Sequence, residues 1–306
     1  MEEQPSPKLV QLHYICRMKL PEYRDQIIDL KAWGIDQYEL SVRVYQSENE
    51  EISGNKPFKL KYWIAERKPN QPVLSFGGAY SNHLLALSAV GKQEGFRTIG
   101  IIRGEVPAVK SLWLTTMEAN GMELQFVSRT DYRQKQEEDF LENLSKQYPD
   151  ALVVPDGGSG QFGFDGAKEM ISEKEPYELI VLPGGTGTTA AAIASKVVDP
   201  FTKVKCFQVL KGKNLLWNEI SRRLNLTQEQ LPHLWIEEDY HFGGYGRLAR
   251  EPEAFKKEFE KLTNIELDNI YGAKAMTGLF TLMRNNEISK GAKILYLHTG
   301  GLGPKN

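Results

Sequence analysis

Short apolar runs alternate with longer amphipathic stretches over most of the chain, from residue 72 onward. The runs have the length and continuity of buried parallel strands, and the stretches between them show apolar residues at helical spacing. We expect strands at residues 73–76, 98–102, 124–127, 151–154, 179–182, 203–210, 234–236 and 293–297. We expect helices near residues 82–94, 108–120, 131–147, 166–173, 190–195, 214–224, 253–262 and 273–284. Repeated strand–helix units predict an α/β protein whose parallel sheets carry helices on both faces.

The first fifty residues carry a weaker pattern. Three prolines interrupt the opening, and the alternation that predicts a strand appears only at residues 39–45. A Ser-Gly-Asn loop then leads to a helix with Pro57 in its first turn. Lys56 falls at the start of this helix, where the helix dipole disfavours a cation. We therefore expect Lys56 to be either solvent-exposed or held for chemistry as a neutral amine or a Schiff base.

A glycine-rich turn, PGGTGTT at residues 183–189, lies between a predicted strand and a predicted helix. Such a turn presents free backbone N–H groups at the positive end of a helix dipole, and its threonines add hydroxyls. A P-loop would need a lysine at the helix start, and none lies between Gly184 and Ser195. Residues 185–190 match G-x-G-x-x-A, but the next strand lacks the acidic residue that holds a nucleotide ribose. The turn is therefore expected to bind a phosphomonoester, with a connection that binds nothing as the alternative.

The composition is that of an ordinary soluble protein: 306 residues, 41% hydrophobic and 25% charged, with a formal net charge of −2. This balance argues against nucleic acid or an anionic membrane as the main partner. Cys16 and Cys206 do not make a disulfide framework, and we expect Cys206 to be buried in a core strand. The opening MEEQPSPK lacks an apolar signal region, and no apolar run has membrane-spanning length. We expect a cytoplasmic protein without a metal site.

Six short motifs carry a resemblance to a known family. They are GNKPFKL at residues 54–60, SNH at 81–83, VPDGGS at 154–159, GGTGTT at 184–189, YGAKAM at 271–276 and HTGG at 298–301. Each motif is weak alone, but their order is that of one family. From about residue 40 to residue 301, the chain resembles the 1-aminocyclopropane-1-carboxylate deaminase/D-cysteine desulfhydrase family. That family lies within the pyridoxal-phosphate enzymes of fold type II, which have a tryptophan synthase β-like fold.

The resemblance implies two open, twisted, mostly parallel sheets flanked by helices, with the cofactor in the cleft between two domains. Residues 1–58 and 157–306 would form a large cofactor-binding domain, and residues 59–156 a small inserted α/β domain. The resemblance further implies pyridoxal 5′-phosphate as the cofactor, a small amino acid as the substrate and a homodimeric enzyme.

Roles for individual residues are also implied by the resemblance. Lys56 would form the Schiff base and then move the α-proton of the substrate. Asn82 would hold the phenolic oxygen of the cofactor ring, and Thr299 its pyridine nitrogen. The cofactor phosphate would lie on Gly184, Gly185, Thr186, Gly187, Thr188 and Thr189. The substrate carboxylate would bind at a helix N-terminus made by Ser81, Asn82 and His83. The catalytic side chains besides Lys56 would be Ser81, Tyr245 and Tyr271.

The chain departs from the family at Gly272, where the deaminase branch has glutamate and the desulfhydrase branch has threonine. Thr299 agrees with the desulfhydrase branch. A hydroxyl at the pyridine nitrogen leaves that nitrogen neutral, which suffices for β-elimination of a good leaving group and disfavours opening of a cyclopropane. Gly272 is expected to leave a space beside the ring. Lys59 is expected on the helix surface, and His298 in a structural role.

The resulting functional hypothesis is a pyridoxal-phosphate-dependent lyase that deaminates a small amino acid by α-proton removal and β-elimination. A D-cysteine desulfhydrase-like reaction would give pyruvate, ammonia and sulfide. The alternative within this class is 1-aminocyclopropane-1-carboxylate deaminase. From another class, a degenerate protein that only binds a phosphate ligand is kept because Gly272 departs from both branches. A nicotinamide-dependent oxidoreductase ranks below these three.

Overall fold

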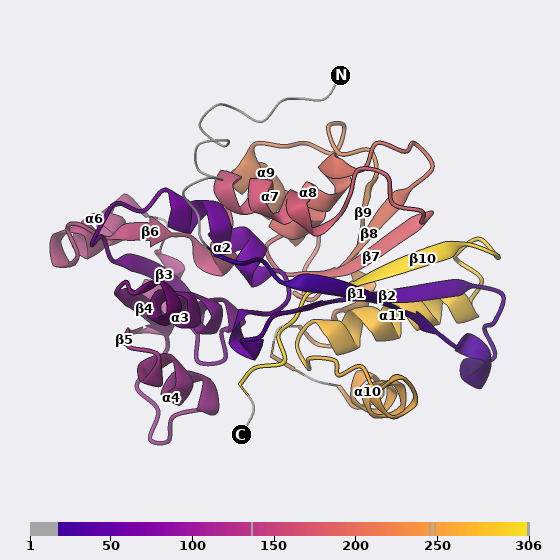
Figure 1. Ribbon diagram of the computed structural model, residues 1–306, viewed down its shortest axis with the longest axis horizontal. Coiled ribbons are helices and arrows are strands. Elements are labelled where there is room, and N and C mark those ends of the chain that lie inside the picture. The colour runs from indigo at the N-terminus through magenta and orange to yellow at the C-terminus, as the bar shows by residue number, and fades with distance from the viewer. Residues whose placement is uncertain (1–17, 136, 245, 248, 305–306) are drawn as a thin grey trace.

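The computed structural model describes residues 18–304 except residues 136, 245 and 248. Within this part of the chain, two sheets lie side by side, and helices cover both faces of each (Figure 1). The predicted α/β class and the mostly parallel arrangement of the strands are therefore confirmed.

The large sheet has the strand order β1-β2-β10-β7-β8-β9. Its strands are β1 (Glu22–Ile28), β2 (Glu39–Gln46), β7 (Leu179–Gly184), β8 (Lys203–Gln208), β9 (Leu234–Glu237) and β10 (Lys293–His298). Neighbouring strands are parallel except β1, which runs antiparallel to β2 at one edge. The sequence pattern missed β1 because only its last residue, Ile28, is buried. An exposed edge strand of this kind needs no apolar alternation.

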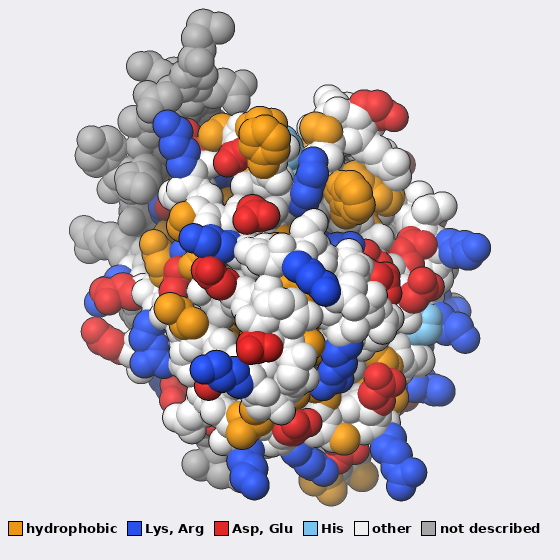
Figure 2. Space-filling view, turned by 90° about the vertical axis from the view of Figure 1, so that its right-hand side faces the viewer, with side chains coloured by type: hydrophobic (Ala, Val, Ile, Leu, Met, Phe, Trp, Pro, Cys, Tyr) orange, Lys and Arg blue, Asp and Glu red, His pale blue; other side chains and the backbone are white. Residues whose placement is uncertain are grey.

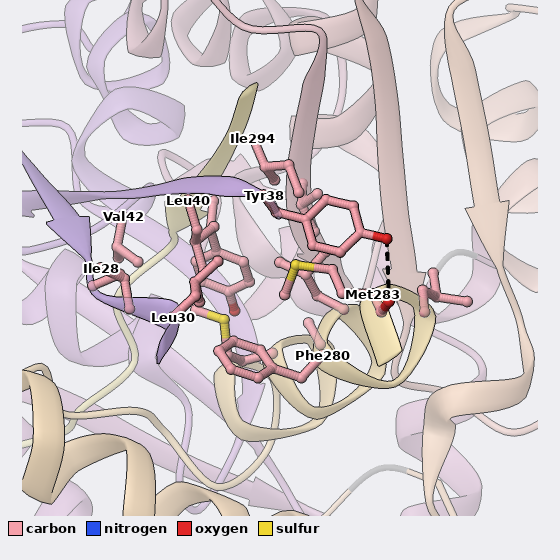
Figure 3. Close-up of a cluster of buried hydrophobic side chains, with 14 of the residues drawn as sticks. Ile28, Leu30, Tyr38, Leu40, Val42, Phe280, Met283 and Ile294 are labelled. Carbon is pink, nitrogen blue, oxygen red and sulfur yellow. Dashed lines mark hydrogen bonds between the residues drawn. The ribbon is translucent and has the colours of Figure 1, made fainter. Parts of the chain in front are cut away.

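Helices enclose the large sheet from both sides (Figure 1). On one face lie α10 (Arg250–Thr263) and α11 (Gly272–Arg284), and on the other lie α7 (Gln161–Ala167), α8 (Thr188–Lys196) and α9 (Leu215–Leu224). Figure 3 shows the core between α11 and the strands, where Phe280 packs below Leu40 and Ile294. In the same cluster the Tyr38 hydroxyl donates to the carbonyl oxygen of Met283 at 3.2 Å.

The small sheet is fully parallel, with the order β5-β4-β3-β6. Its strands are β3 (Val73–Gly78), β4 (Thr98–Arg103), β5 (Met122–Val127) and β6 (Leu152–Val154). One face packs against α2 (Lys56–Ala65), α3 (Asn82–Glu94) and α4 (Leu112–Ala119), and the other against α5 (Arg129–Arg133) and α6 (Glu138–Gln147). All strands of this sheet come from residues 73–154. The division of the chain into domains at residues 58 and 157 stays a prediction.

Two predicted helices differ from the structure. The stretch at 131–147 forms α5 and α6 rather than one helix. The helix predicted at 166–173 instead begins at Gln161 and contains two glycines, Gly163 and Gly166. The glycines are needed for close packing: a Cβ on Gly166 would lie 2.0 Å from the Phe58 carbonyl oxygen of α2. Tertiary packing here overrides the weak helix propensity of glycine.

The molecular surface is mixed in charge. Figure 2 shows the end of the molecule that lies on the right in Figure 1, where acidic and basic side chains are interspersed with scattered hydrophobic ones. Cys206 is buried in β8, as predicted. Among the described residues, no helix combines the length and apolar character that crossing a membrane requires.

Candidate active site

A cavity of about 300 Å³ lies between the two sheets, at the carboxyl ends of β3, β7 and β10. Open parallel sheets bind ligands at this end of their strands. Its lining includes most of the predicted site residues: Lys56, Ser81, Asn82, His83, Gly184, Gly185, Thr186, Gly187, Thr189, Tyr271 and Thr299. Thr188 is buried beside them, with its hydroxyl 3.3 Å from that of Thr186. Tyr245 lies outside the residues that the structure describes.

Lys56 is the first residue of α2, and its position is fixed by the preceding asparagine. The Lys56 amine donates to Asn55 Oδ1 at 2.5 Å, and Asn55 Nδ2 donates to Thr189 Oγ1 at 3.0 Å. Burial lowers the pKa of Lys56 to about 8, although the negative charge of Asp268 opposes the shift. At neutral pH about a tenth of such amines are unprotonated, far more than for an ordinary lysine. The cavity therefore contains an amine able to attack a carbonyl carbon.

Lys59 lies one turn further along α2, and the prediction that it is a helix-surface lysine is wrong. Its side chain is buried, and its Nζ donates to the Thr186 hydroxyl at 3.5 Å. Burial holds the pKa of Lys59 well below its usual value, and the nearby charge of Lys56 lowers it further. An anion bound at the glycine-rich loop would favour the protonated form of this amine. Lys59 is thus placed to pair with the phosphate predicted there.

The glycine-rich loop ends at Gly187, and α8 begins at the next residue. Gly187 has a φ of +74°, and a Cβ there would lie 2.5 Å from Ile220 Cγ1. At Gly185, a Cβ would lie 3.0 Å from Cε1 of the Tyr271 ring. Both positions therefore require glycine for packing. The Lys59 amine donates to the Thr186 hydroxyl, two residues before α8 begins, an arrangement suited to a dianion.

Asp156 is the only carboxylate among the described residues that line this cavity. Its charge is compensated by Arg223, whose Nη2 donates to Asp156 Oδ1 at 3.0 Å. Arg223 also donates to the Ser159 hydroxyl and, at 2.6 Å, to Glu219 Oε2. Because the cavity lining also contains the basic residues Lys56, Lys59, Arg103 and Lys135, the cavity favours a ligand with several negative charges.

Ser81 and His83 begin α3, and the structure gives them different roles. Ser81 is the N-cap, its hydroxyl oxygen accepting from the Leu84 N–H at 3.2 Å. The ring of His83 is fixed on the other side, with Nε2 2.7 Å from the Ser75 hydroxyl. Since Ser75 donates its hydrogen to the Val154 carbonyl at 2.7 Å, His83 Nε2 must be the donor to Ser75.

His83 therefore carries its proton on Nε2, and its buried Nδ1 is an acceptor that finds no hydrogen-bond partner among the described residues. Burial and the nearby charge of Lys59 hold the pKa of His83 well below its usual value, so the ring stays neutral. A neutral acceptor cannot donate to a carboxylate. The expectation that the His83 side chain binds the substrate carboxylate is thus not supported, whereas the backbone N–H groups that begin α3 remain suitable.

Asp268 organises the start of α11 and was not identified from the sequence. Its buried carboxylate accepts the N–H groups of Ile270, Tyr271 and Gly272 at 2.9, 2.7 and 2.6 Å. Burial raises the pKa of Asp268, while these hydrogen bonds oppose the shift. The bonds fix the backbone of Tyr271, which places its ring against Gly185. The only sequence signal for this role was an acidic residue just before the predicted helix.

The motifs at residues 54–60 and 298–301 contact each other beside the cavity. The Asn55 N–H donates to the Thr299 carbonyl at 3.1 Å, and a Cβ on Gly54 would lie 2.2 Å from the same oxygen. The Thr299 side chain lines the cavity. His298 has the structural role predicted for it, because its Nε2 lies 2.8 Å from the Glu266 carbonyl. Only a glycine at position 54 allows this approach of Lys56 to Thr299.

Comparison with known proteins supports the resemblance found in the sequence. No family profile matches the chain. A putative 1-aminocyclopropane-1-carboxylate deaminase of Thermotoga maritima is 29% identical, covering 87% of this chain and 90% of the relative. A D-cysteine desulfhydrase of Salmonella typhi is 23% identical, covering 82% of this chain and 83% of the relative.

Solved structures share the fold over nearly the whole chain. The crystal structure of an ACC deaminase homologue has a TM-score of 0.78 at 23% identity, covering 98% of this chain and 96% of that one. Serine racemase from Dictyostelium discoideum has a TM-score of 0.66 at 13% identity, covering 97% and 98%. The chain is therefore a homologue of proteins named 1-aminocyclopropane-1-carboxylate deaminase and D-cysteine desulfhydrase, and it has their fold.

Proposed function

We propose that the protein is a pyridoxal-phosphate-dependent lyase that deaminates a small amino acid by α-proton removal and β-elimination, as a D-cysteine desulfhydrase does. The observation that carries this proposal is the position of the Lys56 amine in one cavity with the glycine-rich loop. An amine with a lowered pKa and an anion cradle together match a ligand that carries both an aldehyde and a phosphate. The relatives at 23–29% identity bear names of the same two activities.

The residues present fit pyridoxal 5′-phosphate. Lys56 would hold its aldehyde carbon, the loop at 184–189 with Lys59 would hold its phosphate, and Asn82 would donate to its phenolic oxygen. Thr299 would lie at its pyridine nitrogen. When bound, this cofactor supplies an electron sink for the electrons left at the substrate α-carbon. The cavity of about 300 Å³ is at the small end of the range for ligand pockets, so the substrate must be small.

Different groups of the protein would bind the substrate and move its proton. The amides at the start of α3, together with the Ser81 hydroxyl, bind the substrate carboxylate and orient the α-hydrogen. Lys56, with its pKa lowered to about 8, takes that proton. The C–S bond breaks, the sulfur leaves with the electron pair as thiolate, and the proton held by Lys56 passes to that sulfur to give sulfide. The released enamine takes up water to give pyruvate and ammonia. Tyr271, and Tyr245 as predicted from the sequence, would face the substrate.

The charges around the cavity favour elimination over opening of a cyclopropane. Asp156 is paired with Arg223, and the Asp268 carboxylate accepts three backbone N–H groups outside the cavity lining. Neither carboxylate is available to the pyridine nitrogen, so Thr299 supplies only a hydroxyl. A neutral nitrogen makes a modest electron sink, which is enough when thiolate leaves. The cyclopropane substrate has no such leaving group.

The decisive experiment compares keto-acid products from D-cysteine, L-cysteine and 1-aminocyclopropane-1-carboxylate under one set of conditions. We expect pyruvate and sulfide from D-cysteine, with little 2-oxobutyrate from the cyclopropane. Lys56→Ala is the control for cofactor-catalysed background. A preference for the cyclopropane would establish the deaminase alternative instead. Cofactor binding without turnover of any of the three would favour the degenerate phosphate-ligand binder.

The proposal also includes the homodimer and the cytoplasmic location expected from the sequence. Light scattering coupled to size-exclusion chromatography tests the first, because a dimer has twice the 34.7 kDa mass of the chain. Fractionation of cells that express the protein tests the second.

A further inference from the structure

The side chain of Trp113 contacts that of Asn82. It lies in the first turn of α4, which Ser111 ties to the loop after β3 by donating to the Ala79 carbonyl at 2.8 Å. The indole Nε1 of Trp113 donates to Asn82 Oδ1 at 2.9 Å. Tyr80 packs against the indole ring in an edge-to-face arrangement at 5.5 Å. Trp113, on a helix that packs against the small sheet, thus holds the Asn82 side chain, which the cofactor ring would contact.

These contacts determine which end of the Asn82 carboxamide faces which neighbour. An indole N–H can only donate, so it requires the amide oxygen. On the other side, Asn82 Nδ2 donates to the Gly301 carbonyl at 3.2 Å, and a carbonyl can only accept. Turning the amide over would lose both hydrogen bonds. Because an amide nitrogen carries two hydrogens, one N–H of Asn82 is left for a ligand in the cavity that it lines.

Asn82 needs such support because space lies on both sides of it. A second cavity of about 680 Å³ borders the first, and both Asn82 and Trp113 line it. An asparagine between two cavities has room to rotate, and ordering it costs conformational entropy. The Trp113 ring is itself held in place, because a Cβ on Gly303 would lie 2.0 Å from Trp113 Cζ2. The position of Asn82 between the two cavities therefore depends on the indole of Trp113.

We propose that Trp113 is a positioning residue, which holds the Asn82 carboxamide so that its N–H donates to an oxygen of the bound ligand. This inference rests on the proposed function, in which that oxygen is the phenolic oxygen of pyridoxal phosphate. Trp113 is not among the described residues that line the first cavity, so it acts through Asn82. The consequence is an effect on cofactor affinity and on the spectrum of the bound cofactor, in addition to any effect on turnover.

The test is a double-mutant cycle on cofactor affinity, measured by equilibrium dialysis against pyridoxal phosphate. Trp113→Phe keeps an aromatic ring but removes the donor, and it should weaken cofactor binding about five- to tenfold, the value of one hydrogen bond. Asn82→Ala should weaken binding by at least as much. The double variant should bind no more weakly than Asn82→Ala alone, since Trp113 acts through Asn82. The visible absorption maximum of the bound cofactor should shift in both single variants.

Trp63→Phe is the matched control, because the buried Nε1 of Trp63 has no hydrogen-bond partner to lose in the part of the chain that the structure describes. It should leave cofactor affinity unchanged. Asn82→Asp keeps an acceptor for Trp113 but replaces the amide N–H by a carboxylate oxygen, so it should bind cofactor more weakly than Trp113→Phe. If Trp113→Phe does not fold, the cofactor affinity of Asn82→Asp still tests the inference. Full affinity in Asn82→Asp would overturn the inference.

The outcomes separate this inference from the proposed function. If the wild-type protein does not bind pyridoxal phosphate, the proposed function fails. If the wild type binds it and Trp113→Phe binds it equally well, the function stands and the role of Trp113 is refuted. Additive losses in the double variant would also refute that role, because they would place the effect of Trp113 elsewhere.

Discussion

A carboxylate oxygen of Asp268 occupies the space in which a side chain at Gly272 would begin: a Cβ on Gly272 would lie 2.8 Å from Asp268 Oδ2. The same oxygen accepts the Gly272 N–H at 2.6 Å. The expectation that Gly272 leaves an open space beside the ring is therefore wrong. The space beside Gly272 is taken by a buried carboxylate, so this glycine gives no room for a larger substrate.

Gly272→Ala should therefore destabilise the protein by about 1–3 kcal/mol, because the new methyl group must displace Asp268 or distort the start of α11. Chemical denaturation measures the change in the free energy of unfolding. Gly78→Ala is the matched control, since among the described residues, 18–304 without 136, 245 and 248, none beyond the chain neighbours of Gly78 has an atom within 4 Å of a Cβ there. An equal effect of the two substitutions would contradict the steric explanation.

Lys56 and Lys59 should separate in a labelling experiment. Borohydride reduction of the cofactor-loaded protein should attach the cofactor to Lys56, and peptide mapping should find it there. Lys59→Ala should keep this label but bind the cofactor more weakly, because it removes a cation at the Thr186 hydroxyl. Lys56→Ala should lose the label. If the label is found on Lys59 in the wild-type protein, the assignment of Lys56 as the Schiff-base lysine is wrong.

Lys56 should also make the stability of the cofactor-free protein depend on pH. Its pKa is about 8 when folded and near 10.5 when unfolded, so the unfolded chain binds more protons between these two values. The free energy of unfolding then rises with pH over that window. Lys56→Met should be more stable than the wild type by up to about 3 kcal/mol below pH 8. The difference should vanish above pH 10.5.

Urea denaturation of both proteins at several pH values checks this prediction. Lys92→Met, on an exposed part of α3, is the control for replacing a lysine. A stability difference between wild type and Lys56→Met that does not change from pH 7 to pH 11 would show that lost packing, rather than a buried charge, is responsible.

In the glycine-rich loop, a side chain should cost more cofactor affinity than a missing hydroxyl. Gly185→Val would push against the Tyr271 ring and cover the backbone N–H groups that approach the phosphate. Thr188→Ala removes one hydroxyl that bonds to Thr186 within the loop. We expect at least a tenfold larger loss of affinity from the first change, measured by dialysis. Similar losses would count against binding through the backbone.

Gly187→Val is a different case, because its Cβ would meet Ile220 of α9 rather than the ligand. It should lower the melting temperature of the cofactor-free protein, whereas Gly185→Val should mainly lower cofactor affinity. Melting curves recorded with and without pyridoxal phosphate distinguish the two effects.

The sequence predicted the parallel strands and most helices, because their apolar periods are set by burial in sheets with helices on both faces. It also placed Lys56, Asn82 and Thr299 in one site through short motifs whose spacing reflects loops at strand ends. What these motifs do not contain is the direction of each side chain. His83 turns toward Ser75, and Lys59 turns inward, because neighbours distant in sequence decide the environment of each.

Asp268 and Trp113 could not be assigned for the same reason. An acidic residue before a helix and a tryptophan in a helix are common features, and only the folded chain shows which N–H groups or which amide they meet. The edge strand β1 was not predicted, because all but one of its residues are at least partly exposed and they show no alternation of apolar and polar side chains.

The strand order of the large sheet also constrains when the site can form. The last strand, β10, lies between β2 and β7, near the middle of that sheet. The Thr299 carbonyl that follows β10 accepts from Asn55, next to the lysine at the opposite end of the chain. During synthesis the Lys56 amine therefore emerges roughly 240 residues before the segment that completes its surroundings. A nascent chain that stops before β10 lacks this part of the site, so cofactor capture must follow the synthesis of β10 rather than guide the early folding of the chain.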